Sequence, residues 1–167
     1  MPQDNQTSCR RIDLDRVEAL RLLATVPLGR IVFTRQALPT VRPVNHILDH
    51  GDIVIRTHEG AALTYHAQQD DGTGVVVAYE ADAIDPVTHL GWSVVVTGYA
   101  RLVTDPGELA RIRSLLHAWA PQPGMDQAVR ISPELVAGVR LTGEEGMEEK
   151  VPGQAWEHGR RSVQPHD

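Results

Sequence analysis

The sequence predicts one mainly β domain, a small antiparallel barrel of about six strands with peripheral helices. Short runs rich in Val, Ile and Thr are separated by turn signals such as Asp49-His50-Gly51, which is typical of strands joined by hairpins. The strands do not alternate regularly with helices, which argues against a doubly wound α/β fold. The 167 residues are 41% hydrophobic and 4% aromatic, so one domain can form a core built mainly from Val, Leu, Ile and Ala.

The expected helices are few and have recognisable starts. Asp13 can cap a helix that runs to Ala24, and Pro27 follows its end. A short helix is expected over residues 60–67. Asp105-Pro106 predicts a third helix to about Trp119, because Asp is a favoured cap and Pro is favoured at the first helical position.

The expected strands lie between and after these helices. They cover residues 28–34, 40–48, 52–57, 75–81, 92–104, 127–132 and 135–141, where the last two are two strands or one interrupted strand. Gly98 predicts a bend or bulge within the longest of them.

The ends of the chain are expected to contribute little to the core. Residues 1–11 read as a flexible leader, residues 12–141 as the barrel domain, and residues 142–167 as a flexible charged tail in which only Trp156 could dock on the barrel. The net charge of −6 argues against a nucleic-acid-binding domain. No apolar run reaches the ~20 residues of a membrane span, and the first residues have no signal-peptide core. We therefore expect a cytoplasmic protein that binds neither membrane nor nucleic acid.

Several kinds of active site are disfavoured by missing motifs. The sequence has no Gly-rich phosphate loop and no G-x-S-x-G elbow, which weakens the NTPase, Rossmann and hydrolase interpretations. The single cysteine, Cys9, cannot form an internal disulfide. His46, His50, His58 and His66 lack the spacing of metal ligands. Surface or hydrogen-bonded histidines are the commoner case, and no metal site is predicted.

Arg42-Pro43-Val44-Asn45 is the first segment that could meet a ligand. Proline cannot donate a hydrogen bond to a sheet, so Pro43 predicts a strand edge or an interruption of pairing. In a barrel this leaves a gap in the wall, where backbone groups and Asn45 could face a planar ligand. An ordinary edge strand without a ligand is the alternative.

Two further segments could also contribute. Arg56 and Thr57 lie between a strand and an expected helix, where backbone N–H groups and a guanidinium can bind phosphate; the alternative is a capped helix with a surface arginine. Trp92 and Ser93 open the longest strand. A tryptophan there is more often a core or interface residue than a stacking platform.

Taken together, these segments resemble the pyridoxamine 5′-phosphate oxidase-like, FMN-binding split-barrel superfamily. The resemblance covers about residues 13–141 and is closest to small bacterial flavoproteins, not to the vitamin-pathway oxidase. The segments that carry it, in order, are Gly29-Arg30-Ile31-Val32-Phe33, Pro43-Val44-Asn45, Val54-Ile55-Arg56-Thr57 with Gly60, Val77-Ala78-Tyr79-Glu80-Ala81-Asp82, and Gly91-Trp92-Ser93-Val94-Val95-Val96 with Gly98.

The resemblance implies a six-stranded antiparallel split β-barrel that forms a two-fold homodimer, with flavin at the interface between subunits. It places Arg42, Pro43, Val44 and Asn45 along the flavin ring. The same resemblance places Arg56 and Thr57 near the phosphate and ribityl chain, and Trp92 and Ser93 on a neighbouring strand. The implied activity is that of a flavin-dependent oxidoreductase with a small-molecule substrate that the sequence does not name. No catalytic acid or base is predicted.

The sequence departs from this family at Ala61 and Ala62. Relatives carry a polar-basic pair such as Ser-Lys there, and each charge-assisted hydrogen bond lost is worth roughly 1.5–3 kcal/mol. The only lysine, Lys150, lies in the tail. The chain could bind FMN through Arg56 or use a deazaflavin. It could also be a non-catalytic binding module that has lost tight flavin binding. A haem-binding relative is a weaker alternative, because no histidine has a clear axial position.

Overall fold

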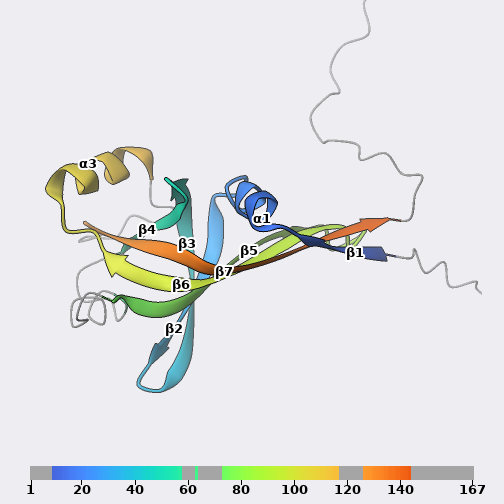
Figure 1. Ribbon diagram of the computed structural model, residues 1–167, viewed down its shortest axis with the longest axis horizontal. Helices are drawn as coiled ribbons and strands as arrows, with labels where there is room; N and C mark the ends of the chain where they lie inside the picture. The colour runs from blue at the N-terminus through green and yellow to red at the C-terminus, as the bar shows by residue number, and fades with distance from the viewer. Residues whose placement is uncertain (1–8, 58–62, 64–72, 117–125, 144–167) are drawn as a thin grey trace, which may run out of the picture.

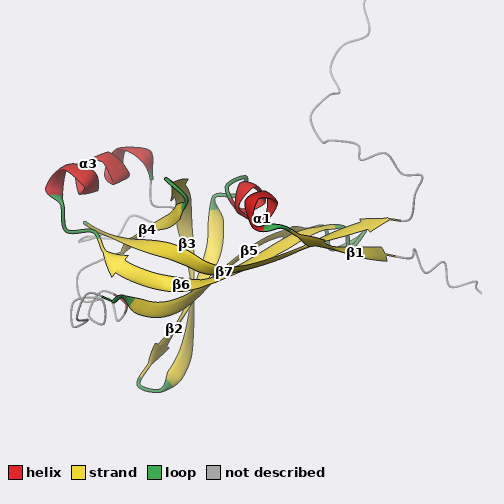
Figure 2. Ribbon diagram, viewed as in Figure 1, coloured by secondary structure: helices red, strands yellow, loops and turns green. Residues whose placement is uncertain are grey.

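The computed structural model describes residues 9–57, 63, 73–116 and 126–143. Within these ranges the elements, shown in Figures 1 and 2, are β1 (Cys9–Leu14), α1 (Arg16–Leu23), β2 (Leu28–Arg35), β3 (Leu38–Asp49), β4 (Asp52–Thr57), β5 (Val75–Ile84), β6 (Gly91–Leu102), α3 (Pro106–Leu115) and β7 (Gln127–Gly143). Three expectations fall outside the described residues: the helix over residues 60–67, Trp119 and Trp156. Within residues 60–67 only Leu63 is described, and it is buried in the main core.

Six strands close a ring in which every pairing is antiparallel. The order is β1-β7-β4-β3-β2-β5-β6, and β6 also pairs with β7. Strands β2 to β7 therefore form a six-stranded barrel, while β1 lies outside the ring and pairs with the end of β7. The predicted mainly β class and six-stranded antiparallel split barrel are confirmed, and residues 135–141 continue 127–132 as one strand.

The barrel wall is interrupted along one edge of β7. On that edge β4 pairs with residues 127–131 and β1 pairs with residues 138–143. Between these two pairings the guanidinium of Arg16 donates hydrogen bonds to the carbonyl oxygens of Pro133, at 2.8 Å, and Glu134, at 3.3 Å. A side chain from α1 thus satisfies backbone groups that a neighbouring strand would otherwise pair.

Helix α1 begins two residues later than expected. Asp15 is its cap and accepts a hydrogen bond from the Glu18 amide at 2.9 Å, whereas Asp13 lies in β1. The helix buries Ala19, Leu22 and Leu23 against the barrel. At Gly138 a side-chain Cβ would come within 3.0 Å of the Ala19 Cβ, so the glycine allows the close packing of α1 on β7.

The boundaries of the barrel domain also differ from the expectation. Cys9, Arg10 and Arg11, expected in the leader, form the first half of β1, and β7 continues two residues past Leu141. The side chains of β1 are mostly exposed. Strand β1 therefore has no apolar pattern of its own, and its conformation comes from pairing with β7.

One turn and one bulge occur where glycines in the sequence predict them. His50 and Gly51 have φ angles of 53° and 88°, the left-handed pair that closes a two-residue hairpin between β3 and β4. The β6–β7 register shifts between Thr97 and Gly98, which confirms the predicted bulge. A Cβ at Gly98 would overlap the Ser132 carbonyl oxygen, which explains the glycine.

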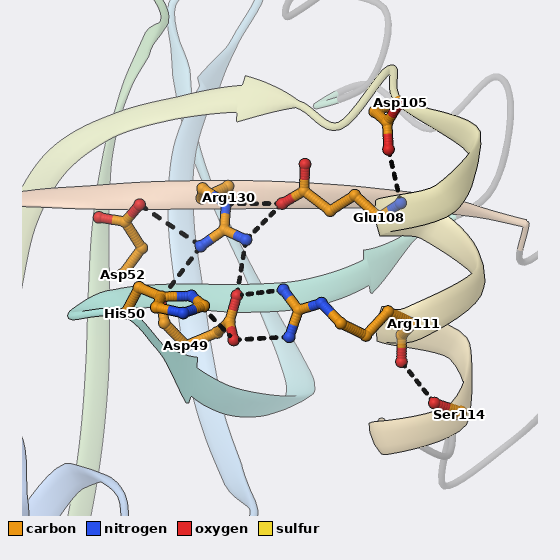
Figure 3. A network of polar contacts seen from close by, with 8 residues as sticks. All are labelled: Asp49, His50, Asp52, Asp105, Glu108, Arg111, Ser114 and Arg130. Atoms are coloured by element: carbon orange, nitrogen blue, oxygen red, sulfur yellow. Dashed lines mark hydrogen bonds and ion pairs between the residues drawn. The ribbon is translucent and has the colours of Figure 1, made fainter.

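Helix α3 packs on the outside of the barrel and is tied there by a polar network (Figure 3). Asp105 caps the helix and Pro106 is its first residue, as expected. Ile112 and Leu116 pack with Val54 and Ala128 in a second apolar cluster.

Asp49, 9% exposed, is the centre of the network. Its carboxylate accepts two hydrogen bonds from Arg111, at 2.9 and 2.7 Å, and one from Arg130 at 2.7 Å. Arg130 also pairs with Glu108 of α3 and lies 3.5 Å from Asp52. The hydrogen bonds from Arg111 and Arg130 hold the pKa of Asp49 well below its usual range. The network joins α3 to β7 and to the β3–β4 turn.

Candidate functional site

Pro43 lies where β3 has a strand on one side only. Strand β2 pairs with residues 38–45 of β3, and Pro43 is opposite Arg30. Strand β4 pairs with β3 only over residues 46–49. Among the described strands, none therefore covers the second edge of β3 at Pro43. This is the interruption that a proline in a barrel strand predicts.

The residues beside Pro43 have different surroundings. Arg42 is exposed and forms no ion pair with any residue that the structure describes. The Val44 carbonyl oxygen lies 3.4 Å from the Tyr79 hydroxyl. The Asn45 amide donates to the Pro27 carbonyl at 3.3 Å. Arg42 is thus available to an anion, whereas Asn45 is attached to the loop between α1 and β2.

Arg56 and Thr57 are the last two residues of β4. Successive side chains of a strand point to opposite faces. Thr57, 8% exposed, follows Ile53 and Ile55 on the core face, and its register partner is Gln127. Arg56 follows Val54 on the α3 side and donates to the Leu116 carbonyl at 3.4 Å. A single ligand group could reach both side chains only beyond the end of the strand.

Trp92 and Ser93 lie far from the end of β4. Trp92 is 8% exposed and packs in the main core, and Ser93 is half-buried opposite Asp82 and Val139. Thr57 pairs with Gln127 at the start of β7, whereas Trp92 pairs with Arg140 near its end. At about 3.3 Å per residue, these positions are about 40 Å apart along the strand. Within one chain, the predicted residues thus form two separate groups.

Ala61 and Ala62 lie outside the described residues. These are the positions at which the sequence lacks the family's phosphate donors. His58 and His66 also lie outside the described residues. In the described ranges no group of three or more His, Cys, Asp or Glu side chains could hold a metal ion. No helix of the described residues is long and apolar enough to cross a membrane.

His46 and Tyr79 form a buried polar pair. The sequence named His46 only among histidines expected to be exposed or hydrogen-bonded, and it gave Tyr79 no such role. His46 is 3% exposed; its Nδ1 lies 2.7 Å from the Tyr79 hydroxyl and its Nε2 lies 3.0 Å from the Leu23 carbonyl oxygen. A carbonyl only accepts, so Nε2 carries the proton and Nδ1 accepts from Tyr79. Burial lowers the pKa of His46 and raises that of Tyr79. His46 is thus a hydrogen-bonded core histidine.

His46 also lines an open cavity of about 380 Å³ between the end of α1 and β3. Its other lining residues are Ala24, Thr25, Val26, Pro27, Ile47 and Leu48. Both ring nitrogens of His46 have protein partners, so the cavity offers no unpaired ring nitrogen to a ligand.

The outer face of the sheet carries a continuous row of small and apolar side chains. Direct register pairs link Val41 to Val32, Val32 to Ala78, Ala78 to Thr97 and Thr97 to Leu135. We call these five residues the outer row. Val41 is 52% exposed and Leu135 is 71% exposed. Val32, Ala78 and Thr97 between these ends are half-buried.

Charges lie directly beside the outer row. One nitrogen of the Arg30 guanidinium contacts Glu80 at 2.9 Å and Asp82 at 3.2 Å. Burial and the hydrogen bond with Asp82 raise the pKa of Glu80, although Arg30 acts in the opposite direction. Two carboxylates share one cation, so this charged group carries a net negative charge when both are ionised.

Comparison with known proteins identifies the family. The family model described as pyridoxamine 5′-phosphate oxidase matches residues 15–161. The chain belongs to this family. The match confirms the resemblance seen in the sequence and extends beyond residue 141, into the segment expected as a tail.

Similar proteins match this chain over most of its length. An uncharacterised protein of Mycobacterium tuberculosis is 48% identical over 139 residues, which are 83% of this chain and 91% of that protein. A candidate pyridoxamine 5′-phosphate oxidase from Corynebacterium glutamicum is 34% identical, with a TM-score of 0.64 over 81% of this chain and 96% of that chain. An FAD-binding protein from Mycobacterium smegmatis is 30% identical, with a TM-score of 0.58 over 78% of this chain and 98% of that chain.

Proposed function

We propose that this protein is a homodimeric flavin-binding oxidoreductase whose flavin site is shared between two copies of the chain. The proposal rests on the open edge of β3 at Pro43. The neighbouring Arg42 is exposed and forms no ion pair with any described side chain. Family membership and the FAD-binding relative support a flavin as the ligand.

The residues present fit such a cofactor in chemical type. Arg42 offers a cation for a phosphate or for the electron-rich edge of the flavin ring. Thr57 offers a buried hydroxyl, and the side-chain oxygen of Gln127 opposite it is a buried acceptor without a partner among the described residues. A bound flavin would supply the electron transfer, and these side chains would hold and orient it.

The separation of the predicted residues supports a shared site. Trp92 and Ser93 are near one end of β7, and Arg56 and Thr57 are near the other. One flavin, roughly 10–20 Å long, cannot contact both groups of one chain across about 40 Å of strand. In a two-fold dimer the same surface meets itself, so the second copy can bring its own Ser93 to the first copy's β3 edge, whereas Trp92 stays in the core of its own chain.

The outer row supports the homodimer. Val41 and Leu135 expose apolar side chains at its two ends, and Val76 and Val95 add exposed apolar surface beside it. A second copy that covers this face would remove the apolar surface from water, at about 25 cal/mol per Å². A cytoplasmic location and the absence of nucleic-acid and membrane partners stay predictions.

Absorbance spectra and flavin titrations test the proposal. The purified protein is titrated with FMN, FAD, riboflavin and a deazaflavin while flavin fluorescence is followed. Saturable binding of one flavin per chain is expected, and bound flavin should be reducible by a nicotinamide donor. The reduced spectrum would then report the redox competence of the complex. Absence of binding by all four ligands would contradict the flavin site.

A non-catalytic binding module is the second candidate, favoured by Ala61 and Ala62 at the position where the family carries phosphate donors. It predicts a dimer that binds no flavin tightly. A haem protein would instead show an intense absorption band near 400 nm. His46 does not favour haem, because both its ring nitrogens already have partners.

A further inference from the structure

Gln127 has a buried acceptor atom that the fold does not satisfy. It is the first residue of β7, and its Oε1 is inaccessible to solvent yet has no hydrogen-bond partner in the described part of the chain. Buried polar atoms are nearly always hydrogen-bonded, because an unpaired one loses its water without compensation. An unpaired buried atom therefore calls for an explanation, and a ligand that binds there would provide it.

The register shows what lies beside this atom. Gln127 is directly opposite Thr57 of β4. By strand alternation both residues belong to the face that buries Ile53, Ile55, Val129 and Ile131 in the core. Opposite residues in an antiparallel pair have Cβ atoms about 4.5–5.5 Å apart. Thr57 and Gln127 thus end an apolar strip with two adjacent polar side chains.

The chemistry of these two side chains selects part of a flavin. A side-chain amide oxygen only accepts, so it needs a donor from the ligand. Ionised phosphate oxygens have no proton to donate, whereas the ribityl hydroxyls do. A ribityl hydroxyl can donate to Gln127, beside the hydroxyl of Thr57. This polar end of the apolar strip therefore suits the ribityl chain better than the phosphate.

We propose that Gln127 is a flavin-binding residue whose Oε1 accepts a hydrogen bond from a ribityl hydroxyl. This inference rests on the proposed flavin site and adds to it a residue that the sequence did not indicate. The ribityl chain is common to FMN, FAD, riboflavin and the deazaflavins, so the role does not depend on which of these is bound.

Gln127→Leu tests the inference with ligands that differ in one part. Leucine keeps the size of the side chain but removes the acceptor. Fluorescence titration should show about tenfold weaker binding of riboflavin and of FMN, the loss expected for one hydrogen bond. Lumiflavin, which has a methyl group in place of the ribityl chain, should bind the parent and the variant equally. If Gln127→Leu weakened lumiflavin binding as much as riboflavin binding, the assignment to the ribityl chain would be overturned.

Two further measurements separate a binding role from a structural one. In the absence of flavin, Gln127→Leu should melt at the same temperature as the parent or higher, because the lost atom had no partner. A lower melting temperature would show a structural role instead. Gln127→Met fills a similar volume with only a weak acceptor and should weaken riboflavin binding as much as Gln127→Leu does, whereas parent-like binding would contradict an acceptor role.

The outcomes distinguish this inference from the proposed function. If the parent protein binds no flavin, the proposed function fails and the inference fails with it. If the parent binds riboflavin and Gln127→Leu binds it equally tightly, only the inference fails.

Discussion

Arg111 holds the buried carboxylate of Asp49 by two parallel hydrogen bonds of 2.9 and 2.7 Å, and this contact joins helix α3 to the β3–β4 turn (Figure 3). The paired geometry is the strong form of an arginine–carboxylate contact. Arg130 adds a third donor from β7 at 2.7 Å. Three elements that are distant in the sequence therefore depend on one carboxylate.

Substitution of Asp49 by Asn should destabilise the protein by about 2–4 kcal/mol, because two arginines lose their anion. Chemical denaturation at pH 7 measures this loss. Asp126→Asn is the matched control, since its ion pair with Arg113 is longer, at 3.4 Å, and largely exposed; this variant should lose less than 1 kcal/mol. Equal effects of the two substitutions would contradict the importance of the network.

Asp49 should also govern acid stability. Its pKa is lowered in the folded state by Arg111 and Arg130, so folded protein binds fewer protons than unfolded protein near pH 4. The stabilisation is complete above the unfolded pKa of about 3.9 and is lost as the pH falls below it. Unfolding free energies measured from pH 5 to pH 2 should fall more steeply for the parent than for Asp49→Asn.

His46 predicts a second pH dependence in a different range. Burial lowers its pKa in the folded state, so the unfolded chain takes up a proton first as the pH falls below about 6.5. Stability should therefore decrease from pH 7 to pH 5, by at most about 1.4 kcal/mol per pH unit for one group. NMR titration should show that the His46 ring takes up its proton at a lower pH in the folded protein than in the unfolded chain.

Gly29 should not tolerate a side chain. A Cβ at this position would overlap the Tyr79 ring and hydroxyl and the Glu80 carbonyl oxygen. Because a backbone atom takes part in the clash, Gly29→Ala should cost about 3 kcal/mol. Gly143→Ala is the control, since a Cβ there meets nothing within 4 Å. Thermal melting of the two variants measures the difference, and similar melting temperatures would contradict the predicted clash.

The outer row should determine the oligomeric state. Light scattering should give about twice the chain mass of 18.4 kDa for the parent. Leu135→Asp places a charge on the proposed contact and should shift the protein toward monomer. Val87→Asp is the matched control, because Val87 is 85% exposed in the turn after β5, away from the outer row. A dimer that survives Leu135→Asp but not Val87→Asp would place the interface elsewhere.

Ala61 and Ala62 predict weak recognition of the flavin phosphate. Ala61→Ser combined with Ala62→Lys should tighten FMN binding by about tenfold or more, since it adds a hydroxyl donor and a cation. Riboflavin, which has no phosphate, should gain little. Fluorescence titration with both ligands gives the comparison. An equal gain for riboflavin would show that these positions do not line a phosphate site.

Elements with local signals could be predicted from the sequence alone. The bounds of β4 agree with the expectation at both ends, and the His50-Gly51 turn, the Asp105 cap and the Gly98 bulge all occur where expected. The turn, the cap and the strand depend on residues close together in the chain: a glycine that accepts positive φ, an aspartate that caps a helix, and a run of β-branched side chains. Local physical chemistry is sufficient for such features. The glycine at the bulge can be read from the sequence, although the contact that requires it, with Ser132, is distant.

Only the tertiary structure decided the features that depend on distant pairing. Strand β1 forms from exposed, polar residues because β7 pairs with it, and Asp15 instead of Asp13 caps α1 because Asp13 is taken into that strand. The register of β7 separates Trp92 from Thr57 and brings Gln127 opposite Thr57. A one-residue change of register would move every side chain of a strand to the other face. Register depends on the closing of the whole barrel, which no short segment of sequence specifies.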